Sequence, residues 1–132
     1  MNRIEGKIIR VDTFERYCVT SIACTGEVTF LSLTLELDER YHEGRSVALL
    51  VKETDVIIAK ESFASSVANI IPSTVLKNTR GELFSELELS TSAGTISAII
   101  FTSAIETLKI DTGDSVFALI RATDVALMID EI

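Results

Sequence analysis

The chain has 132 residues, enough for one ordinary domain or two very small ones. Its formal net charge of -8 argues against non-specific nucleic-acid binding, which needs a basic face, but leaves room for a small anion in a local pocket. No apolar run approaches the roughly 20 residues of a membrane-spanning helix, and the N-terminus lacks the features of a signal peptide. We therefore expect a cytoplasmic protein without membrane insertion.

The first half of the chain favours short β-strands. Valine, isoleucine and threonine are abundant there, and turn residues interrupt the apolar segments. Thr25 and Gly26 predict a hairpin turn, and the polar segment 37–43 predicts a helical turn. Strands are expected at 4–11, 16–24, 27–35, 46–52 and 56–59.

The second half repeats this pattern. Strands are expected at 70–77, 83–91, 95–101, 115–121 and 125–129, with turns at 78–81 and 92–94. Ile105 and Leu108 have helical spacing, which predicts one short helix over 102–109.

Two stretches of sequence occur twice. Lys-Glu-Thr-Asp-Val at 52–56 returns as Arg-Ala-Thr-Asp-Val at 121–125, and 2–6 aligns with 69–73. The offset is 67 at the start (69 minus 2) and 69 at the end (124 minus 55), so the units differ by a small loop insertion. We therefore divide the chain into a first module at 1–60, a linker at 61–68 and a second module at 69–132.

Five short strands and a helical turn in about 65 residues suggest a small, partly closed barrel of the OB type. The predicted fold is all-β, with two tandem OB-like five-stranded barrels, each carrying a short helical turn. A unit of this size is only marginally stable alone. We therefore expect the two halves to share a core, or the chain to oligomerise, or both.

The cysteines and the histidine do not indicate a metal site or a disulfide. Cys18 and Cys24 would lie roughly 20 Å apart on one extended strand, too far for a disulfide. His42 is the single histidine and has no Cys/His cluster around it. Because neither a nucleophile motif nor a phosphate loop occurs, we do not expect an enzyme.

The ordered motifs resemble a known family. Residues 66–73 (Ser-Val-Ala-Asn-Ile-Ile-Pro-Ser) and 112–125, with Gly113, Asp114 and the closing Arg-Ala-Thr, are similar to the opening and closing motifs of the Mop, or molbindin, module. This TOBE-like module belongs to molybdate- and tungstate-binding proteins. The first half keeps related motifs at 2–8 and 52–56. The chain therefore looks like the tandem, di-Mop version, and the resemblance covers nearly all of it.

The resemblance implies an oxyanion site. In the family, main-chain N–H groups and hydroxyls of the opening motif, a Thr or Ser after the third strand, and the closing Lys-Ala-Ser/Thr hold the anion. Ala68 replaces the arginine of the opening motif, the first unit lacks Ser-Ala-Arg, and our alignment puts Phe101 at the position of Thr34. By position the implied residues are Thr34, Lys52, Glu53, Thr54, Ser66, Val67, Ala68, Thr102, Arg121, Ala122 and Thr123.

Structural roles for these residues remain open. Lys52 and Arg121 could be solvated strand ends, and Ser66 could be a flexible linker residue. Asp55 and Asp124 are expected to be structural, because a carboxylate repels a dianion.

The leading hypothesis is intracellular binding and storage of molybdate or tungstate, without catalysis. The ligand would be the oxyanion itself, with no organic cofactor and no protein-bound metal ion. The family implies a homo-oligomer, specifically a trimer. An alternative is a ligand-sensing regulatory module that acts through a transporter or regulator partner. A nucleic-acid-binding OB fold is disfavoured by the acidic charge and the eight aromatic residues, six Phe and two Tyr.

Overall fold

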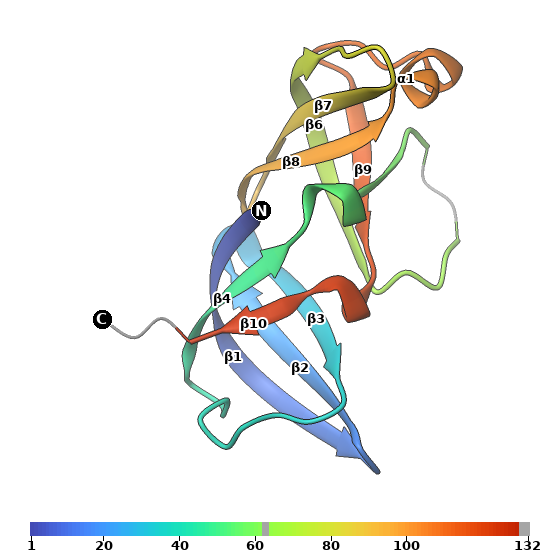
Figure 1. The fold of residues 1–132 in the computed structure, drawn as a ribbon. Coiled ribbons are helices and arrows are strands. Elements are labelled where there is room, and N and C mark those ends of the chain that lie inside the picture. The colour runs from blue at the N-terminus through green and yellow to red at the C-terminus, as the bar shows by residue number, and fades with distance from the viewer. Residues whose placement is uncertain (62–63, 130–132) are drawn as a thin grey trace.

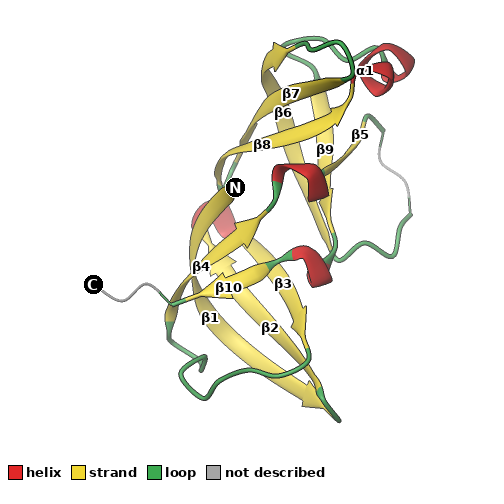
Figure 2. Ribbon diagram, viewed as in Figure 1, coloured by secondary structure: helices red, strands yellow, loops and turns green. Residues whose placement is uncertain are grey.

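The computed structural model describes residues 1–61 and 64–129. The first five-stranded sheet has the strand order β10-β4-β1-β2-β3, and its strands are antiparallel (Figures 1 and 2). Its elements are β1 (Asn2–Phe14), β2 (Tyr17–Cys24), the 3-10 turn η1 (Thr25–Glu27), β3 (Val28–Thr34), β4 (Ser46–Val51) and the distant β10 (Ala126–Met128).

The second sheet has the order β5-β9-β6-β7-β8 and is antiparallel as well. Its elements are β5 (Ile57–Ala59), β6 (Asn69–Thr79), β7 (Phe84–Thr91), β8 (Gly94–Phe101), the helix α1 (Thr102–Leu108) and β9 (Ser115–Ile120). The 3-10 turns η2 (Glu53–Asp55) and η3 (Ala122–Asp124) follow β4 and β9. The all-β prediction with two five-stranded OB-like sheets is confirmed.

The two halves exchange their last strands. β5 follows the first half in sequence but pairs with β9, with Ile57 opposite Leu119. Reciprocally, β10 ends the second half but pairs with β4, with Ala126 opposite Leu50. The red β10 therefore lies beside the blue and green strands of the first half in Figure 1. Each sheet is completed by the other half of the chain.

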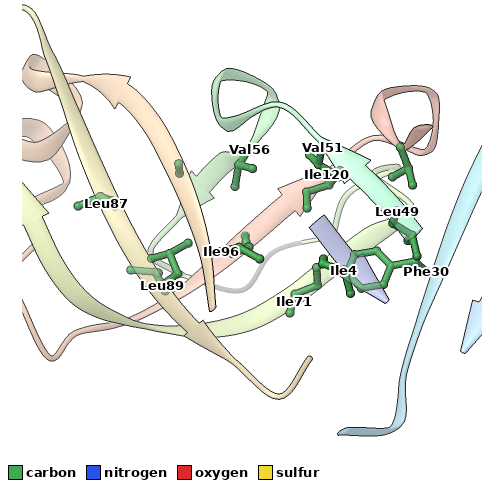
Figure 3. Packing of buried hydrophobic residues seen from close by; sticks show 14 of the residues in the cluster. Ile4, Phe30, Leu49, Val51, Val56, Ile71, Leu87, Leu89, Ile96 and Ile120 are labelled. Atoms are coloured by element: carbon green, nitrogen blue, oxygen red, sulfur yellow. The ribbon is translucent and has the colours of Figure 1, made fainter. Parts of the chain in front are cut away.

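Alternation of apolar and polar residues produces one shared core. In β6, Asn69, Ile71, Ser73 and Val75 are buried while the residues between them are exposed. The buried apolar residues form one cluster that draws on both halves, as Figure 3 shows with Ile4 and Phe30 close to Ile71 and Ile120. The expectation of a shared core is confirmed.

Two asparagines at equivalent positions fasten the halves together. The Asn2 amide donates to Ser97 O at 2.8 Å, and Asn2 Oδ1 accepts from Ser97 N at 2.7 Å. The Asn69 amide donates to Leu31 O at 3.0 Å, and Asn69 Oδ1 accepts from Leu31 N at 2.8 Å. Each half thus bonds the third sequential strand of the other.

The helical turn predicted at 37–43 is wrong. This segment contains turns without helix, whereas its counterpart in the second half forms α1. The Asp38 carboxylate accepts the N–H of Arg40 at 2.8 Å, and Asp38 O accepts the N–H of Tyr41 at 3.0 Å. Short polar side chains that bond the nearby backbone compete with helix formation. In α1, by contrast, Ile105 is buried and ties the helix to the core.

Within the described ranges 1–61 and 64–129, no helix is long and apolar enough to cross a membrane. Both cysteines are free, as expected from their spacing.

Candidate functional site

A pocket of about 420 Å³ lies where the first sheet meets the exchanged end of the second half. We call it the Lys52 pocket. The ends of β3 and β4 form one side, and η3 with the start of β10 forms the other. Its lining residues are Met1, Leu33, Thr34, Leu50, Lys52, Asp55, Thr123, Asp124, Val125 and Ala126.

The pocket brings together three of the residues expected from the sequence. Thr34 ends β3, Lys52 follows β4, and Thr123 lies in η3 of the other half. Strand exchange explains this meeting, because the pairing of β10 with β4 carries η3 to the first sheet. A threonine more than 70 residues away in the chain (123 minus 52 is 71) therefore lies in the same pocket as Lys52.

Two polar groups of this pocket have no protein partner. Lys52 makes no ion pair or side-chain hydrogen bond with the residues that the structure describes. Thr34 Oγ1 is buried, and no described residue bonds it. A buried hydroxyl without a partner costs roughly 1–3 kcal/mol. A ligand oxygen at this point would remove that cost.

The negative charges of the carboxylates near the pocket are neutralised by cations to different degrees. Arg121 Nε donates to Asp124 Oδ2 at 2.8 Å. The amino group of Met1 lies 2.5 Å from Glu53 Oε1, and this ion-pair contact lowers the pKa of the Glu53 carboxyl. Asp55 also lines the pocket and has no ion pair among the described side chains. A ligand with negative charge must therefore be held against the field of Asp55.

The other expected residues lie outside this pocket. Ser66, Val67 and Ala68 precede β6, and Thr102 begins α1. The Thr102 hydroxyl donates to Gly81 O at 2.8 Å and lies 2.8 Å from Ser85 Oγ, so its one proton is already donated within the protein. Glu53 and Ala122 lie in the two 3-10 turns beside the lining residues.

A second pocket of about 400 Å³ occupies the corresponding place in the other half, and we call it the Ile100 pocket. Thr54 of η2 lines it as Thr123 of η3 lines the Lys52 pocket. Apart from Thr54 its lining is apolar: Val56, Ile57, Ile58, Phe84, Ile99, Ile100, Phe101, Ala104 and Leu108. Arg121, the counterpart of Lys52, does not line it.

The Lys52 pocket suits a small oxyanion better than a metal ion. Hydroxyls and an ammonium group donate hydrogen bonds, as an anion requires. Divalent cations need several carboxylate, imidazole or thiolate ligands, whereas this pocket offers two carboxylates, Asp55 and Asp124, and Asp124 is paired with Arg121. In the described part of the chain, no group of three or more His, Cys, Asp or Glu could hold a metal ion.

Sequence reasoning missed the apolar wall of this pocket, formed by Leu33, Leu50, Val125 and Ala126. The available signal was the position of each residue beside an expected one: Leu33 precedes Thr34, and Val125 closes the repeated Thr-Asp-Val motif. These positions predict a common apolar wall only if the exchange of the last strands is known as well.

Comparisons with known proteins agree with the fold. The family model described as the TOBE domain matches residues 65–127. A solved structure of the cytoplasmic molybdate-binding protein ModG, in a crystal form with molybdate bound, is similar with a TM-score of 0.91 and 21% identity. The similarity covers 98% of this chain and 96% of that one. A comparison with curated protein sequences finds no match.

Proposed function

We propose that this protein binds molybdate or tungstate, as the intact oxyanion, in the Lys52 pocket. The pocket itself carries the proposal. It places an unpaired lysine and an unpartnered buried hydroxyl in one cavity, together with a threonine from the other half. The similarity in fold to a molybdate-binding protein supports the same ligand class.

The proposed binding chemistry follows from the shape of the ligand. Molybdate and tungstate are tetrahedral dianions, and each of their four oxygens accepts hydrogen bonds. Lys52 supplies positive charge, while Thr34 and Thr123 supply hydroxyl donors. Hydrogen bonds to charged groups contribute about 1.5–3 kcal/mol each, so a handful of them supports roughly micromolar binding.

We also propose a biological role for this binding. The chain would store or buffer the oxyanion in the cytoplasm and would perform no catalysis. It would act as a homo-oligomer, specifically a trimer, built from a module at 1–60, a linker at 61–68 and a module at 69–132. The remaining residues expected from the family, Glu53, Thr54, Ser66, Val67, Ala68, Thr102, Arg121 and Ala122, lie outside the Lys52 pocket; they stay expectations from the resemblance and are not part of this proposed site.

The direct test is calorimetric titration of the purified chain with molybdate, tungstate and sulfate. Wild-type protein should bind the first two, and Lys52→Ala should weaken both. Lys77→Ala is a matched control, because Lys77 is an exposed lysine on β6 and does not line the pocket. Equal affinity of wild type and Lys52→Ala would refute the proposed site.

A further inference from the structure

The duplicated chain offers two related pockets, and their chemistry differs. Both are bounded by a 3-10 turn with the repeated Thr-Asp-Val motif, η3 in one case and η2 in the other. The Lys52 pocket is lined by a cation, two hydroxyl residues and the carboxylates Asp55 and Asp124, whereas Thr54 is, among the described residues, the one polar residue in the lining of the Ile100 pocket. The strand register shows which residue of the second half corresponds to Thr34.

One hairpin turn is a residue longer in the first half than in the second, so the numbering offset between equivalent residues changes there. β2 and β3 pair Cys24 with Val28 across a three-residue turn. β7 and β8 pair Thr91 with Gly94 across two residues. Because Cys24 and Thr91 are opposite equivalent residues of β1 and β6, Val28 corresponds to Gly94 and the offset is 66 from this point (94 minus 28).

An offset of 66 makes Ile100, not Phe101, the counterpart of Thr34 (100 minus 34). Exposure agrees with this register: Thr34 and Ile100 are both half-buried, and the next residues, Leu35 and Phe101, are 56% and 57% exposed. The alignment of Phe101 with Thr34 is therefore wrong by one residue, because β7 and β8 are joined by the shorter turn.

No nearby group replaces the hydroxyl that Ile100 lacks. The Thr102 hydroxyl is bonded to Gly81 and Ser85. Phe101 stacks on Phe84, with ring centroids 5.1 Å apart, at the edge of the same pocket. The cation is missing too, because Arg121 pairs with Asp124 and lies outside the lining. A dianion there would lose water and gain few donors.

We infer that, of the two related pockets, the chain holds its oxyanion in the Lys52 pocket alone, and that the Thr34/Ile100 difference contributes to this choice together with the cation that lines only the Lys52 pocket. This inference rests on the proposed function and sets its stoichiometry: one anion per chain from this pair of pockets. The Ile100 pocket then contributes to packing and not to binding.

The test uses equivalent substitutions at the two positions, with molybdate as the probe. Thr34→Val removes the hydroxyl at nearly constant volume and should weaken binding by about tenfold or more, as expected for a hydrogen bond to a charged ligand. Thr34→Ser keeps the hydroxyl and should bind more tightly than Thr34→Val, which separates the loss of the hydroxyl from a change in packing. Ile100→Val is the matched control and should change neither affinity nor stoichiometry. Native mass spectrometry counts bound anions, calorimetry gives the affinities, and thermal unfolding verifies that each variant is folded.

The outcomes separate the inference from the proposed function. One molybdate per wild-type chain, bound about tenfold or more weakly by Thr34→Val and with unchanged affinity by Ile100→Val, supports the inference. Two molybdates per chain of similar affinity overturn it, as does equal weakening by both valine variants. One molybdate whose affinity ignores Thr34→Val also overturns it, while oxyanion binding as such still stands. No bound molybdate at all refutes the proposed function, and the inference with it.

Discussion

Asn2 and Asn69 are equivalent residues of the two halves, and each hydrogen-bonds the backbone of the opposite half: Asn2 bonds Ser97, and Asn69 bonds Leu31. Asn69 makes a third bond, from its amide to Ile120 O at 3.1 Å, that has no counterpart among the bonds of Asn2. Both side chains are at least nine-tenths buried. The pair holds together two small units that would each be marginal alone.

Replacing these asparagines should lower stability to different degrees. Asn69→Ala leaves the backbone groups of Leu31 without partners and should cost about 2–4 kcal/mol of unfolding free energy, because unsatisfied buried groups are expensive. Asn2→Ala breaks fewer bonds and should cost less. Urea unfolding measures both. Asn78→Ala is a control, because Asn78 Oδ1 has no partner among the described residues. A larger loss for Asn2→Ala would contradict this ranking.

The two repeated basic residues should contribute unequally to anion binding. Lys52 is unpaired and lines the pocket, whereas Arg121 is held by Asp124. Lys52→Ala should weaken molybdate binding by about 1.5–3 kcal/mol, the usual value of a hydrogen bond to a charged group. Arg121→Ala should have a smaller effect, and the double variant should resemble Lys52→Ala and remain folded. Equal losses in the two single variants, measured by calorimetry, would place the anion between both cations instead.

Removing the uncompensated carboxylate should strengthen binding. Asp55 lines the Lys52 pocket, and its charge opposes that of a dianion. Asp55→Asn should tighten molybdate binding by about 1 kcal/mol, the scale of a solvent-screened charge pair at short range. Asp38→Asn is a matched control, because Asp38 is paired with Arg40 and lies outside the pocket. Weaker binding in Asp55→Asn would show that this carboxylate supports the site, for example by fixing η2.

Acid should weaken the anchoring of the exchanged strand β5. Asp114 Oδ2 accepts the N–H of Asp111 at 2.9 Å and lies 3.3 Å from Lys60 Nζ, just after β5. The Asp111 bond, with help from Lys60, lowers the pKa of the Asp114 carboxyl below its ordinary value. Its stabilisation is therefore present at neutral pH and disappears as the pH falls through this lowered pKa.

The measurement is thermal unfolding of wild type and Asp114→Asn between neutral and strongly acidic pH. Wild type should be the more stable at neutral pH, and the difference should shrink once the pH falls below the ordinary carboxyl range. A difference that stays constant over the whole range would mean that the Asp114 charge is not responsible.

Much of the fold could be predicted because its cause is local. Alternation and turn residues located the ten strands found within residues 1–61 and 64–129, and Ile105 and Leu108 located α1. Strand exchange could not be predicted in this way. β5 and β10 are three residues long and follow a 3-10 turn, so their own sequence does not specify which sheet they join. We attribute the choice of sheet for β5 and β10 to packing in the shared core, which depends on residues distant in sequence.

The site was predictable only in part for a related reason. The family resemblance suggested Lys52, Thr34 and Thr123, which the Lys52 pocket brings together. The equivalence of Thr34 with Ile100 depended on one extra residue in η1, which sequence alignment placed incorrectly. Thr102 illustrates a third difficulty. The resemblance suggested its hydroxyl as an anion ligand, but in the folded chain this hydroxyl is hydrogen-bonded to Ser85 and Gly81.

The most direct measurement is native mass spectrometry of the intact protein with molybdate, tungstate or excess sulfate. Oxyanion binding in the Lys52 pocket predicts a mass increase of one molybdate or tungstate per chain, no increase with sulfate, and loss of the increase in Lys52→Ala. The same spectra report whether the chains form a trimer. A wild-type protein whose mass is unchanged by all three anions would contradict oxyanion binding.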